Sequence, residues 1–129
     1  MTVSVTSEVI KALLAEAARA HPREACGLLF GTSRAITALQ AAANVHPAPE
    51  THFEIDPAIL IAAHRAMRGG GPAVVGCYHS HPHGPAAPSA ADVALAARDG
   101  GIWAIVGAGQ VRFWRSGGDR FCALSYTVI

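Results

Sequence analysis

A short apolar run that leads into two histidines and then into a proline-rich loop constrains the fold of this 129-residue chain more than any other segment. Residues 73–76 (A-V-V-G) follow a glycine-rich breaker and are typical of a buried strand. Side chains two residues apart in an extended chain point to the same side, so we expect His79 and His81 to project together from the end of that strand. Such a pair can chelate one metal ion.

The loop after the histidines brings a carboxylate close to them. Its three prolines prevent regular secondary structure until Ser89, which can cap a helix that we expect over residues 90–98. Asp92 then lies in the first turn of that helix. Ser89 and Asp92 also have the spacing of a capping box, and capping and metal binding can hold together on one turn.

Two imidazole nitrogens and one carboxylate oxygen match a catalytic zinc site, in which a fourth position is left for water. A closed structural zinc site is disfavoured, because Cys26, Cys77 and Cys122 are far apart and form no Cys-x-x-Cys pair. Hydrolysis at such a site also needs a proton shuttle, and Glu24 is the carboxylate that we assign to it. The residues alone leave simpler interpretations open: a solvated histidine pair, and a Glu24 that is an exposed charge after a helix.

The same residues resemble the JAMM (MPN+, JAB-type) metalloprotease domain, whose pattern is an upstream glutamate, then His-x-His, seven residues and Ser-x-x-Asp. Residues 82–88 supply the seven-residue interval without a gap. Residues 22–31 (P-R-E-A-C-G-L-L-F-G) resemble the segment that carries the catalytic glutamate of the family. Asn44 and residues 53–57 resemble further landmarks, so the resemblance spans nearly the whole chain.

The resemblance implies a role for each residue of the motif. His79, His81 and Asp92 would be zinc ligands, and Glu24 would be the general base and acid that acts through zinc-bound water. Ser89 would steady the tetrahedral intermediate by a hydrogen bond. The implied fold is a curved mixed β-sheet flanked by helices and related to the cytidine deaminase fold. Deaminase chemistry is disfavoured, because the Pro-Cys-x-x-Cys ligands of that class are missing.

The implied function is that of a zinc-dependent peptidase or isopeptidase that cleaves after the C-terminal glycine tail of a ubiquitin-like or sulfur-carrier protein. The chain looks like the stand-alone prokaryotic branch, without the insertions by which eukaryotic relatives grip ubiquitin. Two alternatives stay open. One is a non-catalytic MPN scaffold, which typically lacks part of the metal set, and the other is a metal hydrolase that acts on a small amide.

The remaining histidines and cysteines have simpler interpretations. His83 is expected at the rim of the site, with metal binding as its less favoured role, and His52 beside Phe53 could border a substrate groove. Cys77 is expected to be a buried small hydrophobe. The other histidines lack a partner at ligand spacing and are expected either at the surface or beside the metal ligands without binding the metal: His21, His46 and His64.

Composition bounds the class of protein. A chain of 129 residues with 51% hydrophobic residues predicts one domain over residues 1–129. A formal charge of +1 without a basic run disfavours a nucleic-acid or membrane partner, and no segment resembles a signal peptide or a membrane span. Three cysteines without framework spacing favour a reducing, cytoplasmic compartment. A homodimer stays open.

The order of the expected elements predicts an α/β or α+β domain, with helices packed on a sheet. Apolar periodicity predicts helices over residues 7–20 and from Asp56 to Met67, where Asp56 is the cap and Pro57 lies in the first turn. Strands are expected over residues 3–5, 25–30, 35–43, 102–106, 111–115 and 121–127. Residues 44–51 are expected to form a loop.

Overall fold

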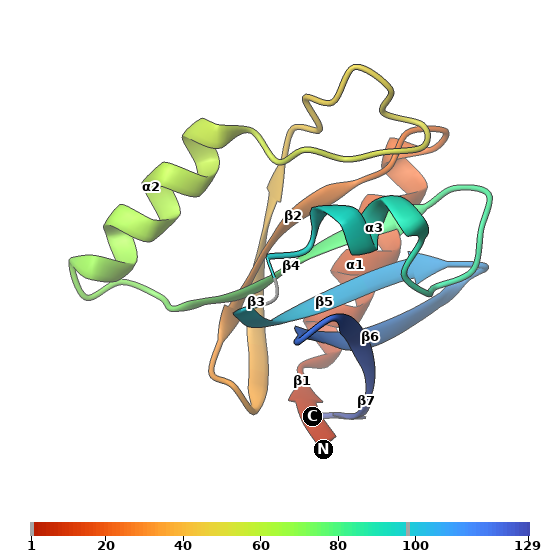
Figure 1. Cartoon of the computed structure of the whole chain (residues 1–129). Coiled ribbons are helices and arrows are strands. Elements are labelled where there is room, and N and C mark those ends of the chain that lie inside the picture. The colour runs from red at the N-terminus through yellow and green to blue at the C-terminus, as the bar shows by residue number, and fades with distance from the viewer. Residues whose placement is uncertain (1, 98) are drawn as a thin grey trace.

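The computed structural model describes residues 2–97 and 99–129, which form a mixed α+β fold dominated by one sheet (Figure 1). The strands are β1 (Thr2–Val5), β2 (Cys26–Gly31), β3 (Ala35–Ala42), β4 (Val74–His81), β5 (Asp99–Gly107), β6 (Gln110–Gly117) and β7 (Arg120–Val128). The helices are α1 (Ser7–Ala20), α2 (Pro57–Arg68) and α3 (Ala90–Leu95). The expected elements are thus confirmed in kind and order, with bounds that differ by a few residues.

The sheet closes on itself, whereas the sequence predicted a curved sheet. Its strand order is β1-β3-β2-β4-β5-β6-β7, and β1 pairs in parallel with both β3 and β7, which joins the two ends into a barrel. The sheet is mixed as expected, because β4 and β5 also pair in parallel while the remaining neighbours are antiparallel. The pairing of β4 with β2 and β5 fixes the strand that carries both histidines.

Two helices begin at the caps that the sequence predicts, and one ends early. Asp56 Oδ1 accepts a hydrogen bond from the Ala58 N–H at 3.0 Å, at the start of α2. Our expected helix over residues 90–98 was wrong at its end, because α3 stops at Leu95 and the chain turns extended at Ala96 to enter β5. Arg98, its expected last residue, lies outside the described residues.

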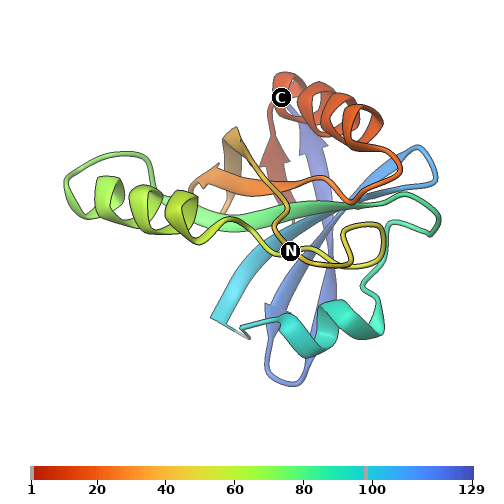
Figure 2. The same ribbon diagram turned by 90° about the horizontal axis from the view of Figure 1, so that it is seen from above.

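The helices lie around the sheet in different ways. Seen from above, α1 and α3 cover opposite sides of the strands, and α2 projects from the body of the molecule (Figure 2). Of the α2 side chains, only Ala63 is buried, and Ile61 is 56% exposed. Among the described residues, no helix is long and apolar enough to cross a membrane.

Alternation along the strands creates two apolar clusters, one on each face of the sheet. Tyr78 of β4 belongs to the larger cluster, together with α1 residues such as Leu13. Trp103 of β5 and Phe53 belong to the smaller cluster on the other face. His79, next to Tyr78, faces this second cluster and contacts the rings of Phe53 and Trp103. The packing of the sheet therefore decides the direction in which the histidines point.

Gly76 shows how tightly β4 and β5 approach each other. A Cβ atom at Gly76 would overlap the backbone carbonyl of Ile102 on β5. We expect Gly76→Ala to lower the free energy of unfolding by about 3 kcal/mol, because backbone atoms cannot give way as a flexible side chain can. Urea unfolding measures this loss. Gly117→Ala is the matched control, since a Cβ there meets no described atom within 4 Å, and an equal loss in both variants would contradict the clash.

Candidate metal centre

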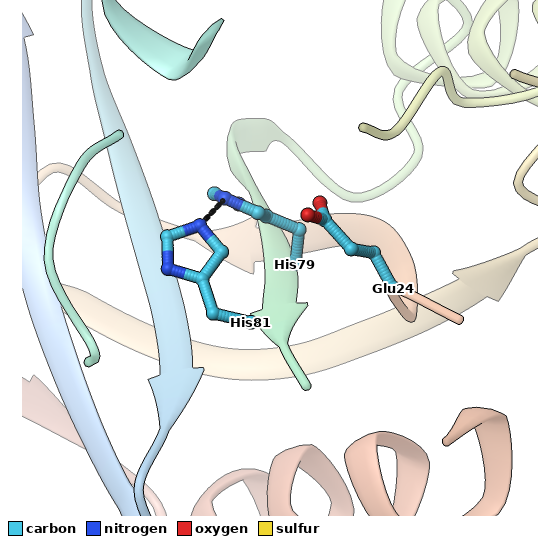
Figure 3. Close-up of side chains that lie close together, drawn as sticks. All are labelled: Glu24, His79 and His81. Carbon is cyan, nitrogen blue, oxygen red and sulfur yellow. Dashed lines mark hydrogen bonds between the residues drawn. The ribbon is translucent and has the colours of Figure 1, made fainter. Parts of the chain in front are cut away.

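The candidate metal centre forms where the end of β4 meets the segment between α1 and β2. His79 and His81 both lie within β4, so the strand continues further than the apolar run predicted. Glu24 comes from the segment before β2, and its carboxylate points toward the two imidazoles (Figure 3). One ligand atom from each of these three residues lies within 4.8 Å of the others. Residues far apart in sequence thus converge on one point.

Asp92 joins the histidine pair through its carboxylate. The Nε2 atoms of His79 and His81 are 3.0 Å apart, and Asp92 Oδ2 lies 3.0 Å from the first and 3.1 Å from the second. Both His79 and Asp92 are buried, with exposures of 0% and 3%. The structure therefore brings together the three residues that the sequence singled out as ligands.

The Pro85 carbonyl orients the His81 ring. This oxygen lies 2.8 Å from Nδ1 of His81 and can only accept, so Nδ1 carries the proton and neutral His81 presents the lone pair of Nε2 to the centre. The loop that holds Pro85 is tied down by Trp114, whose Nε1–H donates to the Ala86 carbonyl at 3.2 Å. It also packs against Gly107, where a Cβ would press on residues 84–86. The position of the Pro85 carbonyl, and with it the orientation of the His81 ring, is thus fixed by the packing of the loop.

Glu24 is buried, which corrects the simpler interpretation that it is an exposed charge. Its exposure is 5%, its backbone N–H donates to the Pro49 carbonyl at 2.7 Å, and its carbonyl accepts from the Asn44 side chain at 3.1 Å. The following residue, Ala25, donates its N–H to Ser80 Oγ at 2.8 Å. No described residue hydrogen-bonds to Glu24 Oε1. The carboxylate is thus held by its backbone and left free to act on a ligand.

Sequence reasoning missed Ser80 as a positioning residue. Ser80 lies between the two histidines and is 3% exposed. It bonds to Ala25 twice, because its own N–H also donates to the Ala25 carbonyl at 3.1 Å. The alternation of a strand could have indicated that Ser80 faces away from the histidines, but its partner lies 55 residues away in sequence and could not be deduced.

Ser89 and Asp92 form the capping box that their spacing predicts. Ser89 Oγ accepts from the Asp92 N–H at 3.1 Å, and Asp92 Oδ2 accepts from the Ser89 N–H at 2.9 Å. The same Oδ2 atom faces both histidines. Helix capping therefore fixes the rotamer of the carboxylate that completes the site, and the Ser89 hydroxyl keeps its proton to donate elsewhere.

The pKa values of all four groups are shifted from their usual values, and burial opposes the charged form of each. Burial raises the pKa of Glu24 to about 7. Burial also lowers the pKa of His79. For Asp92 and His81, burial opposes the shift that is found. Hydrogen bonds from His79 and His81 nevertheless hold the pKa of Asp92 well below its usual range. The hydrogen bond to Asp92 in turn raises the pKa of His81. The site thus pairs an ionised Asp92 with a Glu24 that can exchange a proton near neutrality.

The raised pKa of Glu24 predicts how the stability of the metal-free chain depends on pH. Between about pH 4.5 and 7 the folded carboxyl holds a proton that the unfolded one has lost, so stability falls as pH rises through this window. We expect Glu24→Gln to become more stable than wild type across it, by about 3 kcal/mol at pH 8. Unfolding in urea with a chelator, at pH 5 and pH 8, measures the difference, and a difference that does not change with pH would contradict the shift.

The donor set fits a divalent cation. Two imidazole Nε2 atoms and a carboxylate oxygen crowd within 3.1 Å of one another, and the Pro85 contact leaves at least one of these nitrogens without a proton. The few protons on these groups cannot give each of the three atoms a hydrogen-bond donor. A cation placed among them would accept a lone pair from all three. His79, His81 and Asp92 could therefore hold a metal, with Glu24 within reach of the same point.

The other histidines lie around this centre and not in it. His83 is exposed beyond His81, where its ring meets the ring of His21 edge-on with centroids 5.4 Å apart. His46 and His52 stack with centroids 4.7 Å apart in the loop between β3 and α2. His64 is exposed on α2. Cys77, expected to be buried, is only partly buried by its neighbours.

Two hollows adjoin the site and share Phe53 in their walls. The first, of about 310 Å³, is lined by Asp92, by α3 and by the two stacked histidines His46 and His52, which confirms that His52 borders a groove. The second, of about 560 Å³, runs between α2 and the start of β5 over an apolar floor that includes Leu28 and Trp103. The hollow lined by Asp92 and the groove beside α2 therefore lie next to each other, with Phe53 in the wall of both.

The sequence matches known proteins along most of its length. Residues 6–117 match the family model described as prokaryotic homologs of the JAB domain. The desampylase of Haloferax volcanii is 36% identical over 110 residues, which cover 83% of this chain and 79% of the relative. A Thermus thermophilus protein named "Probable TtuB-protein conjugate cleaving protease" is 40% identical over 62% of this chain and 57% of its own length. The CysO-cysteine peptidase of Mycobacterium tuberculosis is 33% identical over 71% and 64%.

Solved structures agree with this match. A Desulfitobacterium hafniense protein has a TM-score of 0.86 at 29% identity, over 100% of this chain and 93% of the other. A JAB1/MPN domain protein from Archaeoglobus fulgidus has a TM-score of 0.65 at 22% identity, over 98% of each chain, and shows the fold alone. Since the family model covers most of the chain and the fold is that of a JAB/MPN domain, the protein belongs to the prokaryotic homologues of the JAB domain.

Proposed function

We propose that the protein is a zinc-dependent metallopeptidase that cleaves a peptide or isopeptide bond after the C-terminal tail of a ubiquitin-like or sulfur-carrier protein. The observation that carries the proposal is the convergence of Glu24, His79, His81 and Asp92 on one point beside a groove. Support comes from the relatives, whose names describe a desampylase, a protease for TtuB conjugates and a peptidase for CysO-cysteine.

Each residue has a distinct task in the proposed chemistry. His79, His81 and Asp92 would hold zinc, which when bound would polarise the scissile carbonyl and lower the pKa of water. Glu24, with its pKa raised to about 7, would take a proton from the attacking water and pass it to the leaving amine. The Ser89 hydroxyl would donate to the oxygen of the tetrahedral intermediate. These three tasks together account for the hydrolysis of an amide.

The tail of the substrate has a suitable backbone edge to lie against. Residues 54–56 pair with residues 43–45 on one side, through Val45 N–H to the Glu54 carbonyl and Asp56 N–H to the Ala43 carbonyl. On the other side, no described residue bonds to the backbone N–H or C=O of Phe53. An extended glycine tail could add here as a short strand and reach the metal centre past Phe53. Recognition through the backbone suits a tail that has no side chains.

Two other functions remain to be separated from this one by experiment. A panel of fusions, in which CysO or TtuB carries one extra C-terminal residue, is compared with free glycyl dipeptides at equal concentration. We expect kcat/KM to be at least about a hundredfold higher for the fusions, because a folded partner adds contacts along the groove. Equal turnover of the dipeptides would favour a small-amide hydrolase, and no turnover by a zinc-loaded chain would favour a scaffold.

Three broader predictions from the sequence belong with this proposal. We expect the chain to act as one catalytic domain over residues 1–129 and to work in a reducing, cytoplasmic compartment, as its free cysteines suggest. The architectural relation to cytidine deaminases also stays a prediction. Each follows from the family resemblance or from composition, and the metal chemistry above does not depend on any of them.

A further inference from the structure

The side-chain amide of Asn44 links the segment before β2 to the loop between β3 and α2. Its Nδ2 group donates to carbonyl oxygens, and its Oδ1 atom accepts from N–H groups, at N···O distances between 3.0 and 3.4 Å. Its partners are all backbone groups: the carbonyls of Glu24, Pro49 and His52 and the N–H groups of His46 and Glu54. One side chain therefore uses both its donors and its acceptor on the backbone around the metal centre.

Asn44 holds the backbone of Glu24 on one side. Its Nδ2 group donates to the Glu24 carbonyl at 3.1 Å, and the Glu24 N–H donates to the Pro49 carbonyl at 2.7 Å. That same Pro49 carbonyl lies 3.4 Å from Asn44 Nδ2. Both backbone groups of Glu24 thus bond to atoms of the Asn44 network, whereas its side-chain Oε1 has no partner among the described residues. Asn44 therefore helps to decide where the free carboxylate stands.

The same amide holds the two peptide groups that flank Phe53. Asn44 Nδ2 donates to the His52 carbonyl at 3.0 Å, and Oδ1 accepts from the Glu54 N–H at 3.1 Å. In a trans peptide group the C=O and the N–H point in opposite directions, so the N–H and the carbonyl of Phe53 are turned away from Asn44. No described residue bonds to either of them. Asn44 therefore fixes the unpaired backbone edge that the proposed function assigns to the substrate tail.

We propose that Asn44 is a positioning residue that places both the substrate tail, through Phe53, and the proton carrier Glu24 relative to the metal centre. This inference rests on the proposed function, in which Glu24 carries the proton and the tail lies along Phe53. The ring of Phe53 stacks on that of His79 with centroids 4.3 Å apart, so the edge is also held against a metal ligand. Asn44 lines neither hollow, and it acts through the two residues whose backbone it holds.

A double-mutant cycle with Glu24→Gln tests the two effects separately, on zinc-loaded protein with a CysO fusion as substrate. Asn44→Ser alone is expected to lower kcat by about tenfold or more, because a small misplacement of a catalytic group has an effect of this size. In the Glu24→Gln background the same substitution is expected to change kcat by less than about twofold, since the proton carrier is already lost. KM is expected to rise by about threefold or more in both backgrounds, because the Phe53 edge is no longer fixed.

Amide hydrogen exchange of the metal-free chain gives a readout that needs no turnover. In Asn44→Ser the N–H groups of Glu24 and Glu54 are expected to exchange about fivefold faster or more, as the loss of a hydrogen bond would give, while those of β5 keep their rates. Asn44→Asp repeats the cycle with a side chain of the same shape, which keeps the acceptor but has no donor for the carbonyls.

Thr51→Ala is the matched control, because the Thr51 hydroxyl bonds within the same loop, to the Ala48 carbonyl at 3.5 Å and to Nδ1 of His52 at 2.8 Å. It is expected to keep kcat within about twofold. A loss of kcat from Asn44→Ser that is equally large in the Glu24→Gln background would overturn the inference and leave the proposed function standing. An unchanged kcat or KM, equally faster exchange in β5, or failure of both Asn44 variants to fold would do the same. A zinc-loaded wild-type chain that cleaves no fusion would contradict both.

Discussion

Glu24→Gln is expected to retain bound metal and to lower kcat by about a hundredfold or more. Glutamine keeps the shape of the side chain and the backbone bonds to Pro49 and Asn44, but it cannot take up or release a proton. General acid–base catalysis contributes about 10²–10⁴-fold to such reactions, which sets the size of the loss. Elemental analysis and steady-state kinetics on the same sample separate metal binding from proton transfer.

The outcome also distinguishes two roles that the geometry alone allows Glu24. Its carboxylate reaches the same point as both histidines, so it could bind the metal itself. Loss of metal from Glu24→Gln would reveal it as a ligand, and full activity would refute the proton-transfer role. Glu50→Gln is the matched control, because Glu50 is an exposed carboxylate in the loop that anchors Glu24, and it is expected to keep both metal and activity.

His81→Ala is expected to lose metal and activity together. The substitution removes one of three atoms that crowd within 3.1 Å of one another and also releases the contact with the Pro85 carbonyl. Removing a single partner in the surroundings of a metal site typically costs 10–100-fold in metal affinity, so removing a ligand is expected to cost at least about a hundredfold. Competition with a coloured zinc chelator measures the affinity.

His83→Ala is the control for this loss, and it settles the role that the sequence left open for His83. The structure places His83 at the exposed rim beside His21. We therefore expect the His83→Ala variant to bind metal with wild-type affinity. A loss of metal comparable to that of His81→Ala would make His83 a ligand and would require the loop after β4 to adopt a different arrangement.

The parts of the fold that local sequence encodes were predicted well. Helix α1 matches its expected range, because the apolar spacing that predicted it lies within the segment itself. The spacing of the motif also predicted that Asp92 lies beside the histidines, as the structure shows. A strand end, a short proline-rich loop and a capped helical turn leave the Asp92 side chain few positions that it can occupy. The predictions that succeeded are those in which each constraint acts over a few residues.

The remaining features depend on partners that are distant in sequence. The barrel closes because β1 pairs with both β3 and β7, and nothing within residues 2–5 indicates two partners. The alanine-rich segment after Asp92 favours helix, but pairing of Asp99 with Gly117 draws the chain into β5, so α3 ends early. The burial of Glu24 likewise depends on contacts from Asn44, Pro49 and Ser80, which only the folded chain assembles.

The measurement that tests the metal centre most directly is the zinc content of the purified chain, with the His79→Ala/Asp92→Ala variant beside it. The two substitutions remove two of the three crowded donors while leaving Glu24 and its anchors in place. We expect about one zinc per wild-type chain and none in the variant. Wild-type protein that binds no zinc even after incubation with it, or a variant that binds as much as wild type, would contradict the site proposed here.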